Sequence, residues 1–440
     1  RDMTRQHSRR FFLSALGVSS LAPAMTGAAT FSPGNVPYVS RELWQWMRAQ
    51  LVLDPGLAWL DTARFGPTLR AVMAQEYRSR ERQSADFQRY QDSALAFDTI
   101  RAHLGTIGAF LGAAGEDLVF TGGTQEGLTI VARGLDLQPG DEILTTTHDH
   151  PTAIYPWLLE AKRRGLKVTQ LAPDGVAAAP EAIVTKFAGA ITPQTRVLLF
   201  SHVQYTDGTV MPVRELCALA RAKGILSVVD GAQAPGQIEP RIAELDCDAY
   251  ATCFHKWLNA GAGTGALYVR RDLRGRLWPL TVERPTGWDA ADRFGAVPPT
   301  VELPYDAWPE TQAKYGQGSR LRGPGLEGVG IAIEFQQAVN RGRIGARVRE
   351  LVSYLRMRLA GLPGLVFLTP THPSLWAGIV SFAVPNRDHA ALAAALAAED
   401  GVVLRHVAHR GAFDALRVSL HAYSDSSEID RLALALQRKL

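Results

Sequence analysis

A lysine and an aspartate stand where their side chains could do covalent chemistry. Asp230 follows the apolar run GILSVV, and Lys256 lies between His255 and Trp257, with apolar runs on both sides. A carboxylate at the end of a buried strand is costly unless it meets a cation. A lysine amine in an apolar setting can attack an aldehyde. Taken singly, the aspartate is better explained by an N-cap or a structural ion pair, and the lysine by a solvated loop.

The elements that would position these residues alternate between strand-like and helix-like stretches. Strand, turn and helix follow one another in 116–135 and in 141–165, and strand-like apolar runs recur in 195–208 and 225–237. This alternation favours a mostly parallel sheet with helices on both faces. In such a sheet, functional residues gather at the carboxyl ends of the strands. The residues that follow strands and could do chemistry are Thr124, His150, Asp230 and Lys256.

The last part of the chain predicts a smaller α+β unit. A long helical stretch over 327–362 is followed by a strand, a helix, a second strand and a final helix. We therefore expect a large domain over 61–325 and a small domain over 326–440, after an N-terminal segment over 30–60.

The first residues, 1–29, have the pattern of an export signal. Arg9 and Arg10 precede an apolar run that is too short to span a bilayer, and small residues follow it up to Ala29. The pattern resembles the twin-arginine (Tat) signal. It predicts the Tat export machinery as a partner, cleavage after Ala29, and a periplasmic or secreted enzyme. A lone amphipathic anchor helix is the alternative. No later segment is apolar and long enough to predict stable membrane insertion.

Composition excludes two classes of site. The net charge of +4 over 440 residues is small, and no basic stripe with interleaved aromatic residues occurs, so nucleic-acid binding is not expected. The three cysteines, Cys217, Cys247 and Cys253, lack zinc spacing with histidines, so no metal is expected.

Four motifs together resemble the class V aminotransferase family of fold-type I pyridoxal-phosphate (PLP) enzymes. They are TGGTQEG, THDHP, VVDGAQAPG and HKWLNAGAGTGALYV, and the resemblance runs from about Leu60 to the C-terminus. It implies an α/β fold with a mostly parallel, seven-stranded sheet between helices, a smaller C-terminal α+β domain, and PLP as the cofactor. The HKW form and the GSR segment are most similar to the isopenicillin N epimerase-like subgroup.

The resemblance gives several residues a role toward the cofactor. It implies that Lys256 forms a Schiff base with PLP and later moves the α-proton, and that Asp230 pairs with the ring nitrogen. Gln233 would hydrogen-bond the phenolic oxygen of the ring. Gly123 and Thr124 would bind the phosphate at a helix start, where the helix dipole favours an anion.

Further implied roles concern the phosphate, the ring face and the substrate. His255 would help to hold the phosphate, and His150 would stack on the ring, unless it is a surface-loop histidine. Ser319 stands for the usual Thr in a segment through which a neighbouring subunit reaches the phosphate, which implies a homodimer with shared active sites. Arg417 would grip the substrate carboxylate with its planar guanidinium, or form a surface ion pair at a strand edge.

Some positions depart from the family pattern. Arg64 replaces a small residue at the substrate entrance, so we expect it to bind a second anion of the substrate; a solvated arginine is the alternative. Tyr205 stands where Asn or Ser is often found, and could reach the cofactor or substrate. No cysteine lies between Trp257 and Arg417, which excludes the cysteine desulfurase reaction. Cys253 is better explained as a small buried hydrophobe than as a reactive thiol.

The resemblance and the signal together predict an exported PLP-dependent enzyme. We expect a small-molecule amino acid or peptide-derived metabolite as substrate, with transamination or an oxidative or decarboxylating modification. The subgroup includes the Tat-exported type of enzyme that modifies the glutamate side group of the siderophore pyoverdine. A C–S β-lyase or amino-acid epimerase of the same fold is the alternative, and a catalytically inactive binding module is the non-enzyme alternative. A nucleotide loop at GAGTG is disfavoured because those glycines run into a strand rather than a helix.

Overall fold

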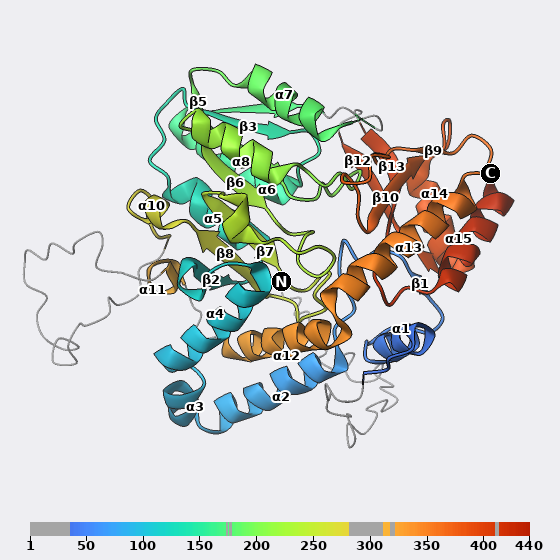
Figure 1. The fold of residues 1–440 in the computed structure, drawn as a ribbon, viewed down its shortest axis with the longest axis horizontal. Coiled ribbons are helices and arrows are strands. Elements are labelled where there is room, and N and C mark those ends of the chain that lie inside the picture. The colour runs from blue at the N-terminus through green and yellow to red at the C-terminus, as the bar shows by residue number, and fades with distance from the viewer. Residues whose placement is uncertain (1–35, 173–174, 176–177, 281–310, 317–321, 410–412) are drawn as a thin grey trace, which may run out of the picture. The chain divides into compact units, whose positions relative to one another are not determined.

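The apolar runs of the sequence form a seven-stranded sheet in the computed structural model (Figure 1). The structure describes residues 36–172, 175, 178–280, 311–316, 322–409 and 413–440. These belong to the compact unit that runs from Phe31 to Leu440. The predicted export segment 1–29 and Ser319 lie outside the described residues, so their expected roles stay predictions.

The order of the strands is β2-β8-β7-β6-β5-β3-β4. Strand β8 runs antiparallel to its two neighbours, and the other neighbouring strands are parallel. The predicted mostly parallel sheet is therefore confirmed, and the glycines of GAGTG lead into a strand as expected. The strands are β2 (Leu118–Thr121), β3 (Glu142–Thr146), β4 (Lys167–Leu171), β5 (Thr195–Ser201), β6 (Leu226–Asp230), β7 (Ala249–Cys253) and β8 (Gly265–Val269).

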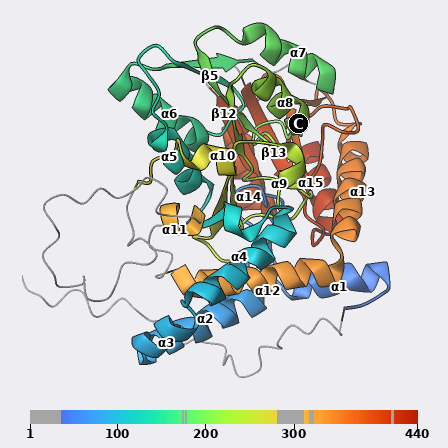
Figure 2. The same cartoon turned by 60° about the vertical axis from the view of Figure 1, so that its left-hand side comes forward.

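Helices cover both faces of this sheet because successive strand residues point to opposite sides. In β6, Val228 packs in the cluster with α5 and α6, whereas Val229 packs in the cluster with α4, α7, α8 and α12. Helices α2, α4 and α12 lie side by side below the sheet (Figures 1 and 2). The helices are α2 (Arg70–Ala85), α3 (Phe87–Ser93), α4 (Phe97–Leu111), η2 (Gly115–Asp117), α5 (Thr124–Gly134), α6 (Pro151–Arg164), α7 (Pro180–Ala190), α8 (Val213–Ala222), α9 (Ile242–Leu245), α10 (Arg271–Arg274), α11 (Thr311–Tyr315) and α12 (Gly323–Val339).

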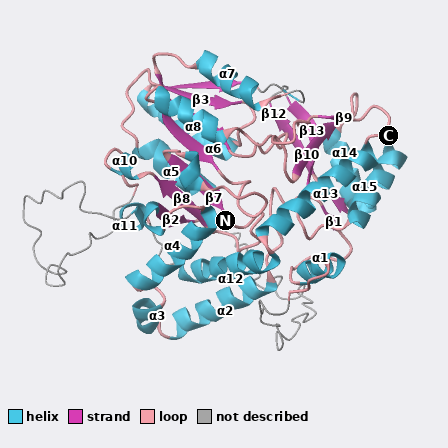
Figure 3. Cartoon of the chain, viewed as in Figure 1, coloured by secondary structure: helices cyan, strands magenta, loops and turns pink. Residues whose placement is uncertain are grey.

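A four-stranded antiparallel sheet, in the order β12-β13-β10-β9, follows the large sheet in the chain (Figure 3). Its apolar residues share a core with α13 and α15. The long helical stretch predicted over 327–362 is two helices, because the chain turns at Asn340, whose φ is 80°. The elements are α13 (Arg341–Leu359), β9 (Val366–Phe367), β10 (Ile379–Ala383), α14 (His389–Asp400), β12 (Arg405–His409), β13 (Phe413–Ser419) and α15 (Ser426–Lys439).

The N-terminal part of the described chain is tied to this second sheet. Strand β1 (Ala58–Trp59) pairs in parallel with β11 (Val402–Val403), and Asp61 forms a bridge with Ser419. Arg48 of α1 (Ser40–Ala49) holds Glu428 of α15 through two hydrogen bonds of 3.0 and 2.9 Å. The loop after β1 is thereby fixed beside β13. No helix among the described residues is long and apolar enough to cross a membrane.

Candidate functional site

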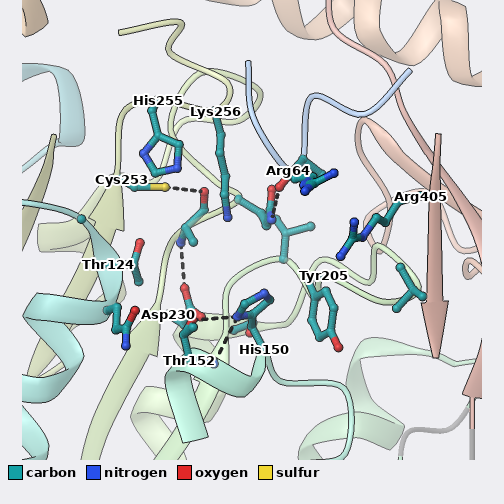
Figure 4. Close-up of a pocket in the computed structure, with 18 of the residues that line it drawn as sticks. Arg64, Thr124, His150, Thr152, Tyr205, Asp230, Cys253, His255, Lys256 and Arg405 are labelled. Carbon is teal, nitrogen blue, oxygen red and sulfur yellow. Dashed lines mark hydrogen bonds between the residues drawn. The ribbon is translucent and has the colours of Figure 1, made fainter. Parts of the chain in front are cut away.

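A pocket of about 430 Å³ lies at the carboxyl ends of the strands, between the large sheet and β12–β13 (Figure 4). The structure brings the predicted residues together there, Ser319 excepted, since that residue is not described. Each sits in a loop or at a strand end, as expected for functional residues of a parallel sheet. The predicted residues that line the pocket are Arg64, Gly123, Thr124, His150, Tyr205, Asp230, Gln233, His255, Lys256 and Arg417.

One side of the pocket is suited to a phosphate. Gly123 is the N-cap of α5 and has a φ of 146°, and nothing lies within 4 Å of where its side chain would be. Thr124 Oγ1 and His255 Nδ1 are buried and have no hydrogen-bond partner among the described residues. Burial, with Lys256 nearby, lowers the pKa of His255 to about 4, so its ring is neutral at neutral pH. Unpaired buried polar groups are costly, which indicates that a ligand completes them.

Among the described residues that line the pocket, Asp230 is the only carboxylate. It ends β6, is 4% exposed, and accepts a hydrogen bond of 2.9 Å from the Ala232 N–H. Burial raises the pKa of Asp230 to about 6, although the Ala232 N–H and the charge of Lys256 oppose that rise. The predicted burial is therefore observed. A protonated ring nitrogen placed against this carboxylate would restore its ionised form.

The segment that carries Lys256 is held rigidly by its neighbour Trp257. The indole is fully buried and donates to Gln233 Oε1 at 2.8 Å, while Gln233 Nε2 donates to the Ala63 carbonyl at 2.9 Å. Gln233 keeps its second Nε2 hydrogen for a ligand. At Gly66, an added Cβ would collide with the Lys256 carbonyl, so the Arg64 loop packs directly beneath the lysine. These contacts explain why an aromatic residue follows the lysine.

His150 caps α6, and its Nδ1 lies 2.7 Å from Thr152 Oγ1 and accepts from the Thr152 N–H at 3.2 Å. The Tyr205 ring meets it edge-on at 4.6 Å. Burial, and the cations Lys256, Arg417 and Arg405 nearby, lower the pKa of His150 to about 3. The ring is therefore a neutral surface inside the pocket rather than a surface-loop histidine.

The loop before His150 is fixed by Asp149, which sequence analysis did not single out. This fully buried carboxylate accepts five hydrogen bonds: three from Thr145 and Thr146 at the end of β3, and two from Ser201 at the end of β5. It thus joins two adjacent strand ends at the floor of the pocket.

Arg417 lies on β13 and is 3% exposed. Its Nη2 donates to Asp61 at 2.8 Å and its Nη1 donates to the Tyr205 carbonyl at 2.8 Å, while its Nε has no partner among the described residues. The surface ion pair considered above is therefore excluded, because both side chains of the pair are buried. A buried guanidinium with one unpaired donor is suited to bind a carboxylate.

The thiols in the described chain are all buried, and all three are free. The Cys253 Sγ donates to the Ala232 carbonyl at 3.6 Å, and burial raises the pKa of this thiol. Since the thiolate is the reactive form, the structure favours Cys253 as a packing residue. No group of His, Cys, Asp or Glu side chains in the described ranges is arranged to hold a metal ion.

Several lining residues were missed from the sequence. Arg405, His406, Val407 and Ala408 belong to β12, and Ser201 ends β5. The stretch RHVAH has only Val407 fully buried, so its pattern gave no strand signal. A search for arginines near Arg417 would have found Arg405, but only the pairing of β12 with β13 places it in the pocket.

The chain is similar to known proteins over most of its length. The family model for aminotransferase class-V matches residues 62–432. An isopenicillin N epimerase from Amycolatopsis lactamdurans is 35% identical over 407 residues, 90% of this chain and 98% of that protein. One from Streptomyces clavuligerus is 31% identical over 396 residues, 89% and 97% of the two chains. A solved structure of a C-DES variant with glycine covalently linked to its PLP cofactor has a TM-score of 0.77 at 23% identity, covering 89% of this chain and 98% of that chain. That last likeness concerns the fold alone.

Proposed function

The chain belongs to the aminotransferase class-V family and is a PLP-dependent enzyme, and from this premise we propose that it is exported and acts on the amino-acid moiety of a peptide or secondary metabolite. The main support for this chemistry is that a single pocket contains both Lys256 and Asp230. On one side of it, Thr124 Oγ1 and His255 Nδ1 have no hydrogen-bond partner among the described residues. An amine, a buried carboxylate and a phosphate cradle are the groups that this cofactor needs.

Different residues of the pocket bind different parts of the cofactor. With PLP bound, Gly123, Thr124 and His255 would hold the phosphate, Asp230 would keep the ring nitrogen protonated, and Gln233 would donate its second Nε2 hydrogen to the ring oxygen. When bound, the cofactor supplies an electron sink that stabilises negative charge on the substrate α-carbon.

Two further side chains act on the substrate. Lys256 would hold the cofactor through its amine, and its Nζ would be the group that accepts and returns the α-proton of the substrate. The Arg417 guanidinium, already fixed by Asp61, donates from Nε to the α-carboxylate and so orients the α-carbon over the pocket.

The reaction that we propose is a transamination or an oxidative or decarboxylating modification. Epimerisation is the second candidate, and the 35% identity to an isopenicillin N epimerase favours it. A C–S β-lyase is the remaining alternative. Sulfur transfer from cysteine is disfavoured because no cysteine follows Trp257 in the sequence and Cys253 is buried.

Export and assembly are proposed from the sequence. Arg9 and Arg10, with the apolar run that follows them, support export to the periplasm through the Tat system. That system carries folded proteins with their cofactor. The segment around Ser319 supports a homodimer in which each subunit completes the other's phosphate site.

The experiment is to reduce the purified protein with borohydride after adding PLP and to map the modified residue by mass spectrometry. We expect visible cofactor absorbance, and label on Lys256 that is absent from Lys256→Ala but retained in Lys223→Ala, a variant of an exposed lysine. Amino acids and peptides are then screened for a change in that absorbance, and each product is identified by mass. A protein that never takes up PLP would contradict the proposal and favour an inactive binding module.

A further inference from the structure

An ion pair lies against the turn that begins α5, just outside the pocket. Glu126, in the first turn of α5, meets Arg322, the N-cap residue of α12: Arg322 Nη1 lies 2.8 Å from Glu126 Oε2 and 3.0 Å from Oε1. Neither is among the described residues that line the pocket, whereas Gly122, Gly123 and Thr124 are. These three residues are called the phosphate turn. The pair therefore contacts the phosphate turn from the side that faces away from the ligand.

Glu126 holds the phosphate turn by accepting a hydrogen bond from it. Its Oε2 accepts from the Gly122 N–H at 2.8 Å. A Cβ added at Gly122 would lie 3.0 Å from that oxygen and 3.4 Å from Arg322 Cζ, so both side chains pack directly on the turn. On the other side, the Thr121 hydroxyl donates to the Gly123 carbonyl at 3.1 Å. The turn is thus fixed from two sides, and the first N–H groups of α5 stay available for an anion.

This arrangement brings two anions to one helix start when a phosphate binds. The helix dipole favours both the carboxylate of Glu126 in the first turn and a phosphate at the N-terminus, but the two anions repel each other. A phosphate monoester carries a charge of about −1.5 to −2 at neutral pH, so this repulsion exceeds that between two single charges. A cation that contacts Glu126 removes most of that penalty.

The position of Arg322 is not explained by its own helix. It is the N-cap residue of α12, where the helix dipole disfavours a cation and where residues with a short side-chain oxygen are preferred. The pair is also partly exposed, with 32% of the Arg322 side chain and 27% of the Glu126 side chain accessible, so by itself it contributes little to stability. Compensation of Glu126 is the better explanation of an arginine at this place.

The charged groups of the pocket do not compensate that carboxylate. The His255 ring is neutral at neutral pH, because burial and the charge of Lys256 lower its pKa to about 4. In Figure 4, the labelled arginines Arg64 and Arg405 stand on the far side of Lys256 from the phosphate turn. Arg322, by contrast, contacts the carboxylate directly.

We propose that Arg322 is a positioning residue for the cofactor phosphate, which acts through Glu126 and does not touch the phosphate itself. It neutralises the carboxylate that fixes the phosphate turn, so that the turn is held in place and still accepts an anion. The affinity for the phosphate then depends on a residue outside the pocket. This inference rests on the proposed function, since it takes Gly122–Thr124 as the phosphate site.

The test compares two ligands that differ only in the phosphate. Pyridoxine phosphate and pyridoxine both lack the aldehyde, so neither reacts with Lys256, and calorimetry gives the ratio of their affinities for the full chain freed of cofactor. Arg322→Ala should reduce this ratio by about fivefold with the affinity for pyridoxine unchanged, because it leaves an uncompensated carboxylate near the phosphate. Glu126→Gln keeps an acceptor for the Gly122 N–H and removes the charge, so it should bind pyridoxine phosphate at least as tightly as wild type.

The double variant separates an effect of charge from a structural one. Arg322→Ala combined with Glu126→Gln should recover the wild-type ratio, because no uncompensated charge remains, whereas two independent structural losses would add. In about 1 M salt, where charges are screened beyond about 3 Å, the loss in Arg322→Ala should shrink. Arg214→Ala, which removes an exposed partner of Glu244 outside the pocket, should behave as wild type. An Arg322→Ala variant that keeps the wild-type ratio, or a double variant that recovers nothing, overturns the inference.

The same titrations distinguish failure of this inference from failure of the proposed function. A wild type that does not prefer pyridoxine phosphate to pyridoxine contradicts the phosphate site, and with it both the proposed function and this inference. Uptake of PLP by Lys256, with a preference for pyridoxine phosphate that Arg322→Ala leaves intact, contradicts this inference alone.

Discussion

The cost of burying one carboxylate can be measured at Asp230. Its pKa is raised to about 6, mainly by burial, against an ordinary value near 4 in the unfolded chain. The folded protein therefore binds this proton more tightly than the unfolded chain does. The stability that the proton provides is complete below about pH 4 and is lost as the pH rises through about 6.

Asp230→Asn should make the cofactor-free protein more stable relative to wild type as the pH rises. Between about pH 5 and about pH 7 the difference should change by about 1.4 kcal/mol, because the ionised carboxylate is buried in wild type alone. Urea unfolding at several pH values measures it, with Asp272→Asn as an exposed control. In the PLP-loaded protein this change with pH should vanish, because the ring nitrogen supplies the missing cation and Asp230 stays ionised over the same range. If the free energies of unfolding of cofactor-free wild type and Asp230→Asn changed with pH in parallel, Asp230 would not be an unpaired buried carboxylate.

Single residues differ in how far their role can be predicted from the sequence. The apolar run before Asp230 predicts burial, and Trp257 beside Lys256 predicts an apolar setting, and both are observed. The partner of Arg417 could not be predicted in this way. Asp61 is 356 positions away in sequence, and the pairing of its segment with Ser419 sets it beside β13.

At the scale of elements, the phosphate turn depends on close packing between β8 and the start of α5. A Cβ added at Gly265, the first residue of β8, would collide with the Thr252 carbonyl and lie 2.6 Å from Gly123 Cα. The glycine at this position lets the antiparallel strand approach the turn that presents Thr124. This explains one glycine of GAGTG by packing, without a nucleotide.

Gly265→Ala should lower the affinity for PLP by about tenfold, because overpacking of this kind costs about 1–3 kcal/mol and would displace the Gly123 turn. Gly263→Ala is the matched control: its φ is 75°, but its Cβ would meet open space. It should lose about 1–2 kcal/mol of stability through its left-handed backbone and keep its affinity for PLP. Fluorescence titration with PLP and urea unfolding give both quantities. Equal PLP affinities for the two variants would show that the turn does not depend on this approach.

The long apolar strands could be predicted from the sequence, whereas the short strands and their pairing could not. The strands β3, β6 and β7 are continuous buried runs and β5 is buried except at Arg196, as expected of a sheet covered on both faces. Strands β1, β9 and β11 have two residues each, and β12 has a single buried residue, Val407, so none has a period that can be read. Because Arg405 lies on β12, the same weakness hid part of the candidate site.

For the molecule as a whole, the pocket joins parts of the chain that are far apart in sequence. Arg64 comes from the loop after β1, Thr124 from α5, Lys256 from the β7–β8 connection, and Arg417 from β13 (Figures 1 and 4). All belong to one compact unit. A ligand that contacts the native pocket and not the unfolded chain must therefore stabilise the entire unit.

PLP should raise the free energy of unfolding of wild type by about 2.7 kcal/mol at one hundred times its dissociation constant. The gain should increase with the logarithm of the PLP concentration, because binding to the folded state alone shifts the equilibrium by mass action. PLP also reacts with exposed lysines, which would not depend on the fold. Lys223→Ala should therefore keep the full gain, whereas Lys256→Ala should lose most of it at the same concentration. Calorimetric melting over a range of PLP concentrations measures this, and an equal rise in both variants would mean that surface lysines, rather than the pocket, bind the cofactor.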